Sequence, residues 1–481
     1  EYADPWSDPR LAEFVLAIPP HLVHRLAEPK RLVRRAMRGI MPEPARLAAQ
    51  KIEPHALFDR GYREQEQATL LELTTNMEAA ARGFVSGGLM SKLFEIDPRS
   101  LAACRVAVGL ILIVDLGIRG SSLAAHYGDA GVLPRDLLGD ALSGTWRWSL
   151  HLLSGSTEFQ AGLFIVAALS AVCLTLGLFT RWATALCWIL WVSLQTRNPL
   201  LLNGGDVMLR MLLFWGMFLP LGAVWSADAR RTAGDRPAVP KIASAGISLQ
   251  VCWMYWMAGY FKIGGGWLDG SALQEILQFD FYARPLAHAL RGQPSFVGGL
   301  GYGTVVLELL GPFLLLLPVR YWRIRMIVIA AFALLHLGIE LTLTVGQFSF
   351  VGWAGLLLFV PGPVWDRWLP NRGGPPAGVR RITDPSAGGW PQSLIRTGLN
   401  GCLLIAVACG AYFNLSAIGR PNEATPEFGP ARRLGELFFW DQRWDLFERP
   451  PRPDGWYVVV ARLSDDRTID LLRDGAEADW D

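Results

Sequence analysis

The sequence predicts an all-α polytopic membrane protein, with about nine transmembrane helices, a small β-hairpin tail and an N-terminal helical fragment. Hydrophobic residues make up 51% of the 481 residues, charged residues make up 18%, and the mean hydropathy is +0.26, which is too apolar for an average soluble enzyme. Nine apolar runs recur after residue 90, and several reach the roughly 20 residues needed to cross a bilayer. Polar segments flank this region on both sides, so soluble ends are expected.

The nine apolar runs define a predicted transmembrane domain over residues 90–415. Their predicted bounds are 98–118, 157–179, 182–197, 206–224, 243–262, 297–318, 323–343, 347–362 and 396–415. The fourth and eighth runs carry the weakest signal for a spanning helix. Glycines inside the runs permit close packing of neighbouring helices.

We interpret residues 1–89 as part of a different protein. They are polar and basic, and their apolar residues have helical spacing. The runs D-P-R-L-A-E-F-V-L-A-I-P-P and E-P-K-R-L-V-R-R-A-M-R-G-I-M-P resemble the C-terminal end of asparagine synthetase-like enzymes, above all the cyclases of lasso-peptide biosynthesis. The resemblance implies that Lys30 matches a lysine facing ATP phosphates. The strand and the S-G-G-x-D-S loop of that family are missing, so we expect a truncated, inactive segment.

Charge and cysteine usage exclude several classes of function. The net charge of +2 gives no reason to expect a nucleic-acid partner. The six cysteines form no C-x-x-C pair, so neither a zinc site nor a disulfide framework is indicated. The first residues lack the basic start and apolar core of a signal peptide.

Arginines and lysines predict the orientation in the membrane. They concentrate in one set of loops, at Arg181, 230–241, 320–323 and 367–381, which should be cytoplasmic. The N-terminus would then lie inside, and the tail, residues 416–481, would be extracytoplasmic. Within this tail, residues 456–463 and 468–472 have β-type patterns separated by a turn, which predicts the hairpin.

Two long loops on the opposite side, 121–156 and 263–295, are expected to form short interfacial helices over a cavity. The second loop begins beside Lys262, which ends the fifth apolar run and is followed by three glycines. A lone ammonium at the edge of a hydrocarbon layer is a snorkelling anchor or a functional group. The aromatic residues Trp253, Tyr260 and Trp267 around it could desolvate the amine and line a cavity, which favours function.

The pattern A-G-x-x-K followed by W-x-x-G resembles the lysine-bearing segment of vitamin K-dependent γ-carboxylases and of their bacterial relatives, the HTTM (horizontally transferred transmembrane) domain proteins. The resemblance covers about residues 97–473. It implies a bacterial inner-membrane protein in which Lys262 deprotonates a vitamin K-like quinol, followed in the carboxylases by carboxylation of a glutamate. A lipid-soluble quinone and a peptide are the implied substrates.

Further polar residues fall within the apolar runs. Asn203, Asp206 and Arg210 match an N-x-x-D stretch of the family, and Asp206 and Arg210 are four residues apart, so they can pair on one helical face. Gly205 stands where the animal carboxylases have a histidine that assists catalysis, which puts glutamate carboxylation in question.

Three more polar residues lie in the sixth and seventh runs. Glu308 is in mid-run, where an unpaired carboxylate would be costly, and an acidic residue of the carboxylases matches it. His336 and Glu340 share a helical face; we interpret them as a histidine oriented by a carboxylate, not as a metal site.

The predicted topology places most of these residues in the outer half of the membrane, together with Asp115. Unrelated snorkelling would populate both halves, so the convergence favours a functional site. We expect the Lys262 amine to contact Asp206 or Glu340 first, and His336 next.

Two functions remain open from the sequence. The chain could be an enzyme with a lysine base acting on a lipid-soluble quinol-like substrate. It could also be a non-enzymatic membrane protein that binds a lipid or peptide, or serves peptide maturation or export. A transporter is a weaker alternative, because the runs show no inverted repeat.

Overall fold

The computed structural model divides the chain into two units, Glu1–Gly87 and Gly88–Asp481. It describes residues 93–231, 241–280, 282–369, 390–418 and 429–447, together with three short strands near the C-terminus. The predicted N-terminal fragment and its Lys30 lie outside the described residues. Everything below therefore concerns the second unit.

All nine apolar runs form helices. They are α9 (Pro98–Gly120), α12 (Thr157–Leu176), α13 (Thr180–Arg197), α14 (Gly204–Gly216), α16 (Lys241–Lys262), α19 (Pro294–Leu315), α20 (Trp322–Thr342), α21 (Phe348–Leu357) and α23 (Trp390–Ser416). Shorter elements connect them: α10 (Leu123–Tyr127), α11 (Arg135–Leu142), η3 (Leu150–Leu152), η4 (Pro199–Leu201), α15 (Ala227–Arg231), α17 (Ser271–Ile276), α18 (Pro285–Leu290), η5 (Val319–Tyr321), α22 (Gly362–Trp368) and α24 (Gly429–Phe438).

The prediction of nine spanning helices is not confirmed. Within the described residues, five helices are long and apolar enough to cross a membrane: α9, α12, α19, the helix through η5 and α20, and residues 398–416 of α23. A sixth is obtained if α21 and α22, bent by 95°, count as one span. Of the remaining runs, α14 has 13 residues, too few to cross, and α16 carries Lys262 and Gln250.

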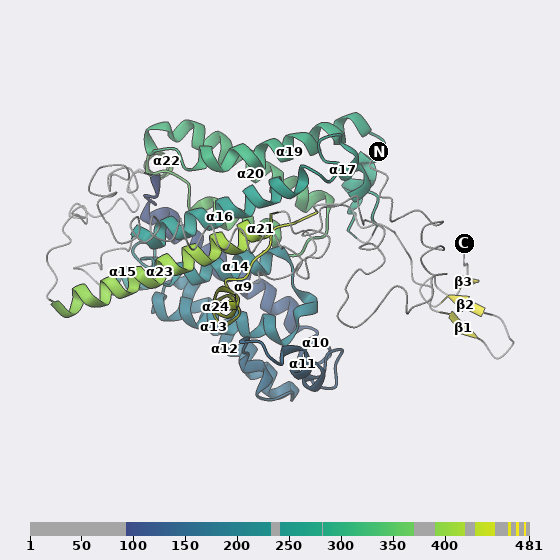
Figure 1. Cartoon of the computed structure of the whole chain (residues 1–481), viewed down its shortest axis with the longest axis horizontal. Coiled ribbons are helices and arrows are strands. Elements are labelled where there is room, and N and C mark those ends of the chain that lie inside the picture. Colours follow the sequence, from purple (N-terminus) through teal and green to yellow (C-terminus); the bar gives the residue numbers. More distant parts are fainter. Residues whose placement is uncertain are drawn as a thin grey trace, which may run out of the picture. The chain divides into compact units, whose positions relative to one another are not determined.

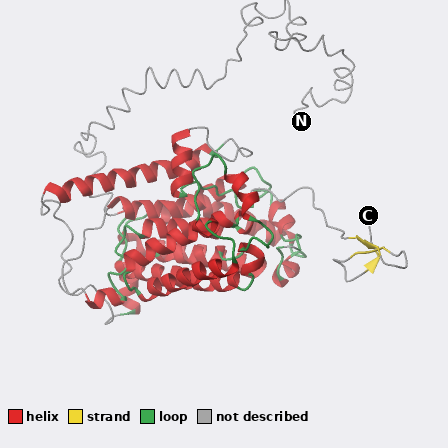
Figure 2. Ribbon diagram, turned by 90° about the horizontal axis from the view of Figure 1, so that it is seen from below, coloured by secondary structure: helices red, strands yellow, loops and turns green. Residues whose placement is uncertain are grey.

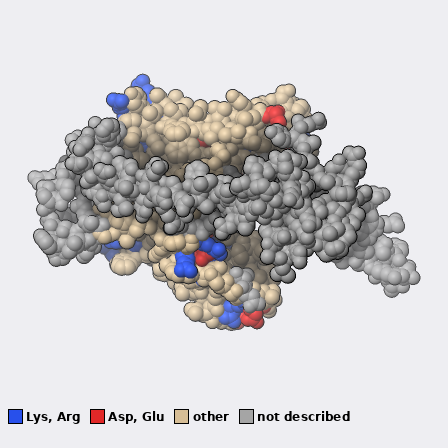
Figure 3. Space-filling model, in the orientation of Figure 1, with Lys and Arg blue, Asp and Glu red and all other residues tan. Residues whose placement is uncertain are grey.

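The helices form one bundle, in which Figure 1 places α19 and α20 along the top and α12 and α13 below the centre. The central helices α14 and α16 pack on each other; α14 also contacts α13 and α21, and α16 contacts α19 and α23. Seen from below, the helices of the bundle lie side by side (Figure 2). The upper part of the described surface in Figure 3 is broadly uncharged, as expected of helices that face lipid.

Local signals in the sequence explain where the helices begin. Asp97 caps α9 by accepting a hydrogen bond from the Arg99 backbone N–H at 2.8 Å, and Pro98 takes the first helical position. Asn203 and Asp206 form a reciprocal capping box at the start of α14. Gly177 ends α12 with a φ of 68°, a conformation in which a side chain would be strained.

A hydrophobic core runs through the centre of the bundle, and a second, smaller core lies under the loop after α16. The first contains side chains of α9, α13, α14, α16 and α21 and, from far along the chain, Phe439, Trp440 and Trp444. The second contains Trp267, Ile276 and Val297. The large aromatic residues near position 440 therefore belong to the membrane bundle.

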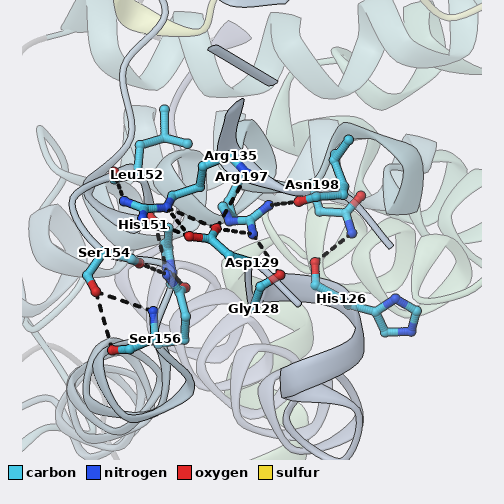
Figure 4. Close-up of polar contacts among 12 residues, drawn as sticks. His126, Gly128, Asp129, Arg135, His151, Leu152, Ser154, Ser156, Arg197 and Asn198 are labelled. Carbon is cyan, nitrogen blue, oxygen red and sulfur yellow. Dashed lines mark hydrogen bonds and ion pairs between the residues drawn. The ribbon is translucent and has the colours of Figure 1, made fainter. Parts of the chain in front are cut away.

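The loop between α9 and α12 is held by ion pairs, which Figure 4 shows. The Asp129 carboxylate accepts hydrogen bonds from Arg135 Nε at 2.8 and 2.9 Å and lies 3.6 Å from Arg197 Nη2. The hydrogen bonds from Arg135 hold the pKa of the Asp129 carboxyl below its usual value. Asn198 adds a hydrogen bond to the His126 carbonyl at 2.8 Å, so α13 fastens this loop.

Three short strands pair antiparallel near the C-terminus: β1 (Val460–Arg462), β2 (Thr468–Asp470) and β3 (Ala476–Glu477). Ala461 lies opposite Ile469. The segment 463–467, which would make the predicted turn, lies outside the described residues, so the hairpin stays a prediction.

Candidate functional site

Lys262 forms a buried ion pair with Glu308. Its Nζ donates to Glu308 Oε2 at 2.7 Å and to Oε1 at 2.8 Å, and both residues are at most 5% exposed. Gly259 makes the close approach possible, since a Cβ there would lie 2.9 Å from the Glu308 Cβ. The ammonium also lies 5.1 Å from the centre of the Trp267 ring, within cation–π range.

The partner of Lys262 differs from the one predicted. We expected Asp206, Glu340 or His336 in hydrogen-bond contact with the amine, and the structure gives Glu308. The general expectation, an acidic side chain from another apolar run, is confirmed. Glu308 takes this place because Gly259 removes the side chain that would separate α16 from α19.

A cavity of about 1440 Å³ opens beside this ion pair. Lys262, Glu308 and Trp267 line part of it, together with apolar residues of α19 and α20. The predicted site residue Asn203 and its neighbours Leu200–Gly204 also line it, as do Leu343–Gly346. The loop 263–293 also lines it through α17 and α18, as expected of the second long loop; residues of the first long loop are not among its lining. The described part of the chain therefore has a large apolar chamber with a charged pair in its wall.

Glycines widen this chamber. At Gly299 and Gly303 of α19 and at Gly338 of α20, an added Cβ would meet nothing within 4 Å. Leu300 and Leu334, which also line the cavity, are 44% and 65% exposed on the surface of the bundle. The cavity wall between α19 and α20 is thus continuous with the apolar outer surface.

The segment 439–447, called the strap below, closes another part of the cavity. Arg443, Asp445 and Phe447 line the chamber, and the Trp267 indole N–H donates to the Phe447 carbonyl at 2.9 Å. Phe439 and Phe447 have φ values of 54° and 52°, a left-handed conformation that non-glycine residues keep only when packing imposes it. The strap, which belongs to the predicted tail, therefore packs against the helices of the bundle.

Asp206 lies in a second buried polar cluster. It is fully buried; Arg119 Nη2 donates to its Oδ1 at 2.6 Å and Gln347 Nε2 to the same oxygen at 2.8 Å. Its Oδ2 accepts from the Asn203 backbone N–H at 2.8 Å. Arg119 also contacts Asp115 at 2.6 Å, so the two acidic residues that we expected at one depth do meet through one arginine.

The predicted ion pair between Asp206 and Arg210 is wrong. Although the two share a helix at four-residue spacing, Arg210 Nη1 donates to Gln195 at 3.1 Å, and Nη2 donates to the Asp441 backbone carbonyl of the strap. Tertiary contacts decide the partners: Arg119 pairs with the Asp206 carboxylate, and the strap supplies hydrogen-bond acceptors to Arg210. Arg210 therefore anchors the strap.

His336 and Glu340 do not act on each other. His336 Nε2 is 2.8 Å from the Tyr255 hydroxyl, whereas Glu340 pairs with Arg284 at 2.9 Å. The interpretation of a histidine oriented by Glu340 is therefore wrong, and Tyr255 is the orienting group. Among the described residues, no group of three His, Cys, Asp or Glu is placed to hold a metal ion.

Not all of the aromatic residues that were predicted to line the cavity do so. Trp267 lines it, whereas Trp253 and Tyr260 do not. Trp253 packs beside Gly410 of α23, and Tyr260 is 38% exposed. Both lie on faces of α16 turned away from the chamber, which the helical period places apart from Lys262.

Sequence reasoning missed four parts of these clusters: Arg119, Gln347, the role of Tyr255, and the strap. The D-x-x-x-R spacing of Asp115 and Arg119 is a usable signal for the first. Tyr255 precedes Lys262 by seven residues, two turns of the same helical face. Nothing in local spacing could have shown that residues 439–447 return to the bundle.

Comparison with known proteins identifies the class. The family model named HTTM domain matches residues 94–365, more than half of the chain, and the model named asparagine synthase matches residues 1–108. No curated protein and no solved structure matches.

The chain therefore belongs to the HTTM domain family, which is the family of vitamin K-dependent γ-carboxylase, a membrane protein. Its first segment carries an asparagine synthase-like match. Lys262, Glu308, His336 and the other residues of both polar clusters lie within the HTTM match, whereas the strap lies beyond it.

Proposed function

We propose that this protein is an integral membrane enzyme in which Lys262 takes a proton from a lipid-soluble, quinol-like substrate. The observation that carries the proposal is the Lys262–Glu308 pair in the wall of a large apolar cavity. A buried ion pair contributes little net stability, so a pair bordering an open chamber is better explained by a ligand.

The geometry supports a base at this position. In an environment of low dielectric constant, the pair can exist as ammonium and carboxylate or as neutral amine and carboxylic acid. When Glu308 holds the shared proton, the Lys262 amine has a lone pair to accept the proton of a quinol O–H. The resulting ammonium faces Trp267, whose ring at 5.1 Å stabilises a cation.

The cavity also suits a lipid-soluble substrate. Its walls on α19 and α20 are apolar and continue into the exposed leucines of the outer surface. An apolar ligand dissolved in the hydrocarbon layer could therefore reach Lys262 from the side, between α19 and α20, without crossing water.

The proposed reaction ends at deprotonation of the quinol. Gly205 replaces the histidine of the animal carboxylases, and a Cβ there would lie 2.8 Å from the backbone nitrogen of Phe348. The space that a histidine side chain would need is thus occupied by the start of α21. Carboxylation of a peptide is accordingly outside this proposal.

The orientation that we propose follows the basic loops: a bacterial inner-membrane protein with a cytoplasmic N-terminus. It places the loop 121–156 outside. Single cysteines introduced at exposed positions of this loop should react with an impermeant maleimide in intact cells, whereas labelling only after lysis would reverse the orientation.

The test uses the purified chain in nanodiscs with a short-chain naphthoquinol under anaerobic conditions. Ionisation of the bound quinol is followed by its absorbance. The parent should form quinolate, and Lys262→Met should form none while keeping its α-helical circular dichroism. Lys262→Arg should be inactive as well, because a guanidinium keeps its proton at working pH. Full activity of Lys262→Arg would show that the lysine is an anchor.

A second candidate, non-enzymatic binding of a lipid or peptide, is favoured by the absence of the carboxylase histidine at Gly205. It predicts that the parent binds the quinone and the quinol with equal affinity and ionises neither. Isothermal titration of both compounds separates the candidates, since a base that ionises the quinol must bind its deprotonated form more tightly.

A further inference from the structure

Tyr255 and His336 form a second buried proton-holding pair that the proposed base does not use. The Tyr255 hydroxyl lies 2.8 Å from His336 Nε2, and the two residues are 2% and 1% exposed. The Tyr255 ring stacks on Phe332 with 4.0 Å between ring centres. The other ring nitrogen, His336 Nδ1, is buried and has no hydrogen-bond partner. A buried polar atom without a partner calls for a functional explanation.

Glu308 lies between this pair and Lys262. Tyr255 and Lys262 are seven residues apart on α16, two turns on one face, which separates them by about 10 Å along the axis. Glu308 packs its Cβ against Gly259, which lies between them in that stretch of helix. The Glu308 side chain bonds Lys262 in the structure, and the proposed path requires its carboxyl group to reach the Tyr255 hydroxyl by rotation or through one water.

We propose that Tyr255 and His336 are a proton relay that discharges Lys262 through Glu308, on the side away from the cavity. This inference rests on the proposed function. The proton path starts with the ammonium of Lys262, whose N–H bond breaks as an O–H bond forms on Glu308. Glu308 then passes that proton to the Tyr255 oxygen while the original Tyr255 proton moves to His336 Nε2. The products are a neutral amine, a carboxylate, an intact tyrosine and an imidazolium.

The transfer moves a buried positive charge without creating one. Before it, the charge is on Lys262, which contacts the Glu308 carboxylate; after it, the charge is on His336. The relay requires the Glu308 carboxylate to stabilise both states, because desolvation otherwise disfavours a buried imidazolium. The relay returns Lys262 to the basic form required for another substrate molecule.

The first test needs no substrate. Nuclear magnetic resonance of ¹⁵N-histidine-labelled protein in nanodiscs reports the protonation of His336, which is assigned with His336→Gln. In Lys262→Met, the Glu308 carboxylate loses its cationic partner. His336 should then carry the compensating proton, so the imidazolium fraction of His336 should be severalfold higher than in the parent. Adding Glu308→Gln should return it to the parent value. An unchanged His336 in Lys262→Met would overturn the relay.

The second test uses the quinol. Tyr255→Phe and His336→Gln should keep the ionisation of a first quinol by Lys262 but slow the ionisation of a second quinol per protein at least tenfold. The matched controls are Tyr127→Phe and His151→Gln, which alter another buried tyrosine and histidine outside the path and should leave both phases unchanged.

The two tests separate the two ideas. If the parent ionises no quinol while His336 responds to Lys262→Met, the proposed function fails and the proton linkage stands. If quinol ionisation needs Lys262 but Tyr255→Phe ionises the second quinol as fast as the parent does, the relay is wrong and the base stands. An equal loss of the first ionisation in Tyr255→Phe and in Lys262→Met would also overturn the relay, because it would mean a structural role.

Discussion

Asp206 and Lys262 are both buried charges in the bundle, yet their surroundings differ. Asp206 accepts from Arg119, Gln347 and the backbone of Asn203, so both of its oxygens are engaged within packed protein. Lys262 is paired with Glu308, but the pair also borders a cavity of about 1440 Å³. The comparison indicates that a buried charge enclosed by partners holds the fold, and one that borders a chamber is available to a ligand.

The largest effect on stability should come from opening the Asp206 cluster. In Asp206→Ala, the buried Arg119 loses one of its two carboxylate partners and keeps only Asp115. The free energy of unfolding should therefore fall by about 3–5 kcal/mol. Equilibrium unfolding in detergent micelles measures it. The control is Asp280→Ala. Asp280 pairs with Arg291 at the surface and its side chain is 80% exposed, so this variant should unfold like the parent. Equal losses in the two variants would remove the distinction on which the comparison rests.

Gly205 offers a second way to disturb the enclosed cluster. A Cβ at Gly205 would lie 2.8 Å from the Phe348 backbone nitrogen and 2.9 Å from Gln347 Cγ, so Gly205→Ala should destabilise by roughly 1–3 kcal/mol. Gly299→Ala, on the cavity wall with open space around it, should leave stability within about 1 kcal/mol of the parent. Thermal unfolding of both variants checks the pair; a stable Gly205→Ala would show that α21 can move away from α14.

The Lys262 pair should respond differently to removal of both partners. Lys262→Met and Glu308→Gln should each destabilise the protein, because one buried group loses its counter-charge. The double variant should recover roughly 1–3 kcal/mol relative to the sum of the single effects. Removing Arg119 together with Asp206 should give no such recovery, because Asp115 then loses Arg119 and Gln347 loses Asp206. Additive effects at Lys262 would mean that the pair has no energetic coupling.

The smallest effect should appear at the surface loop fastened by Asp129. Arg135 holds the pKa of Asp129 below its unfolded value, so this stabilisation is present above the unfolded pKa, near 4, and is lost as the pH falls through the folded pKa. Asp129→Asn should therefore lower stability at pH 7 by under about 1 kcal/mol and match the parent at acidic pH. A constant difference across the titration would assign the effect to geometry instead of charge.

The apolar runs predicted the helices well, because hydrophobic segments of helical length are a strong local signal. The number of helices that span the membrane could not be predicted from these runs. In α12, five of 20 residues are buried, whereas in α14 eleven of 13 are buried. A central helix packed on all sides by protein need not be long or uniformly apolar, and the sequence does not mark which runs are central.

The sequence drew attention to the charged residues of the apolar runs, but not to their partners. Lys262 and Glu308 were each conspicuous as charges in apolar runs; their pairing depends on Gly259, which lets α16 and α19 approach. The four-residue spacing of Asp206 and Arg210 suggested a pair that Arg119 and the strap override. Local spacing shows which residues share a face, and only tertiary packing decides between competing partners.

The most direct test of the distinction between the two charge clusters is a ligand-dependent melting experiment. The melting temperature of the parent and of the Lys262→Met/Glu308→Gln variant is measured with and without saturating short-chain naphthoquinol. The parent should melt higher with quinol, whereas the variant should melt close to the parent without ligand and show no shift with it. If the variant shifts as much as the parent, the Lys262–Glu308 pair is not the ligand-facing site, and the central claim is contradicted.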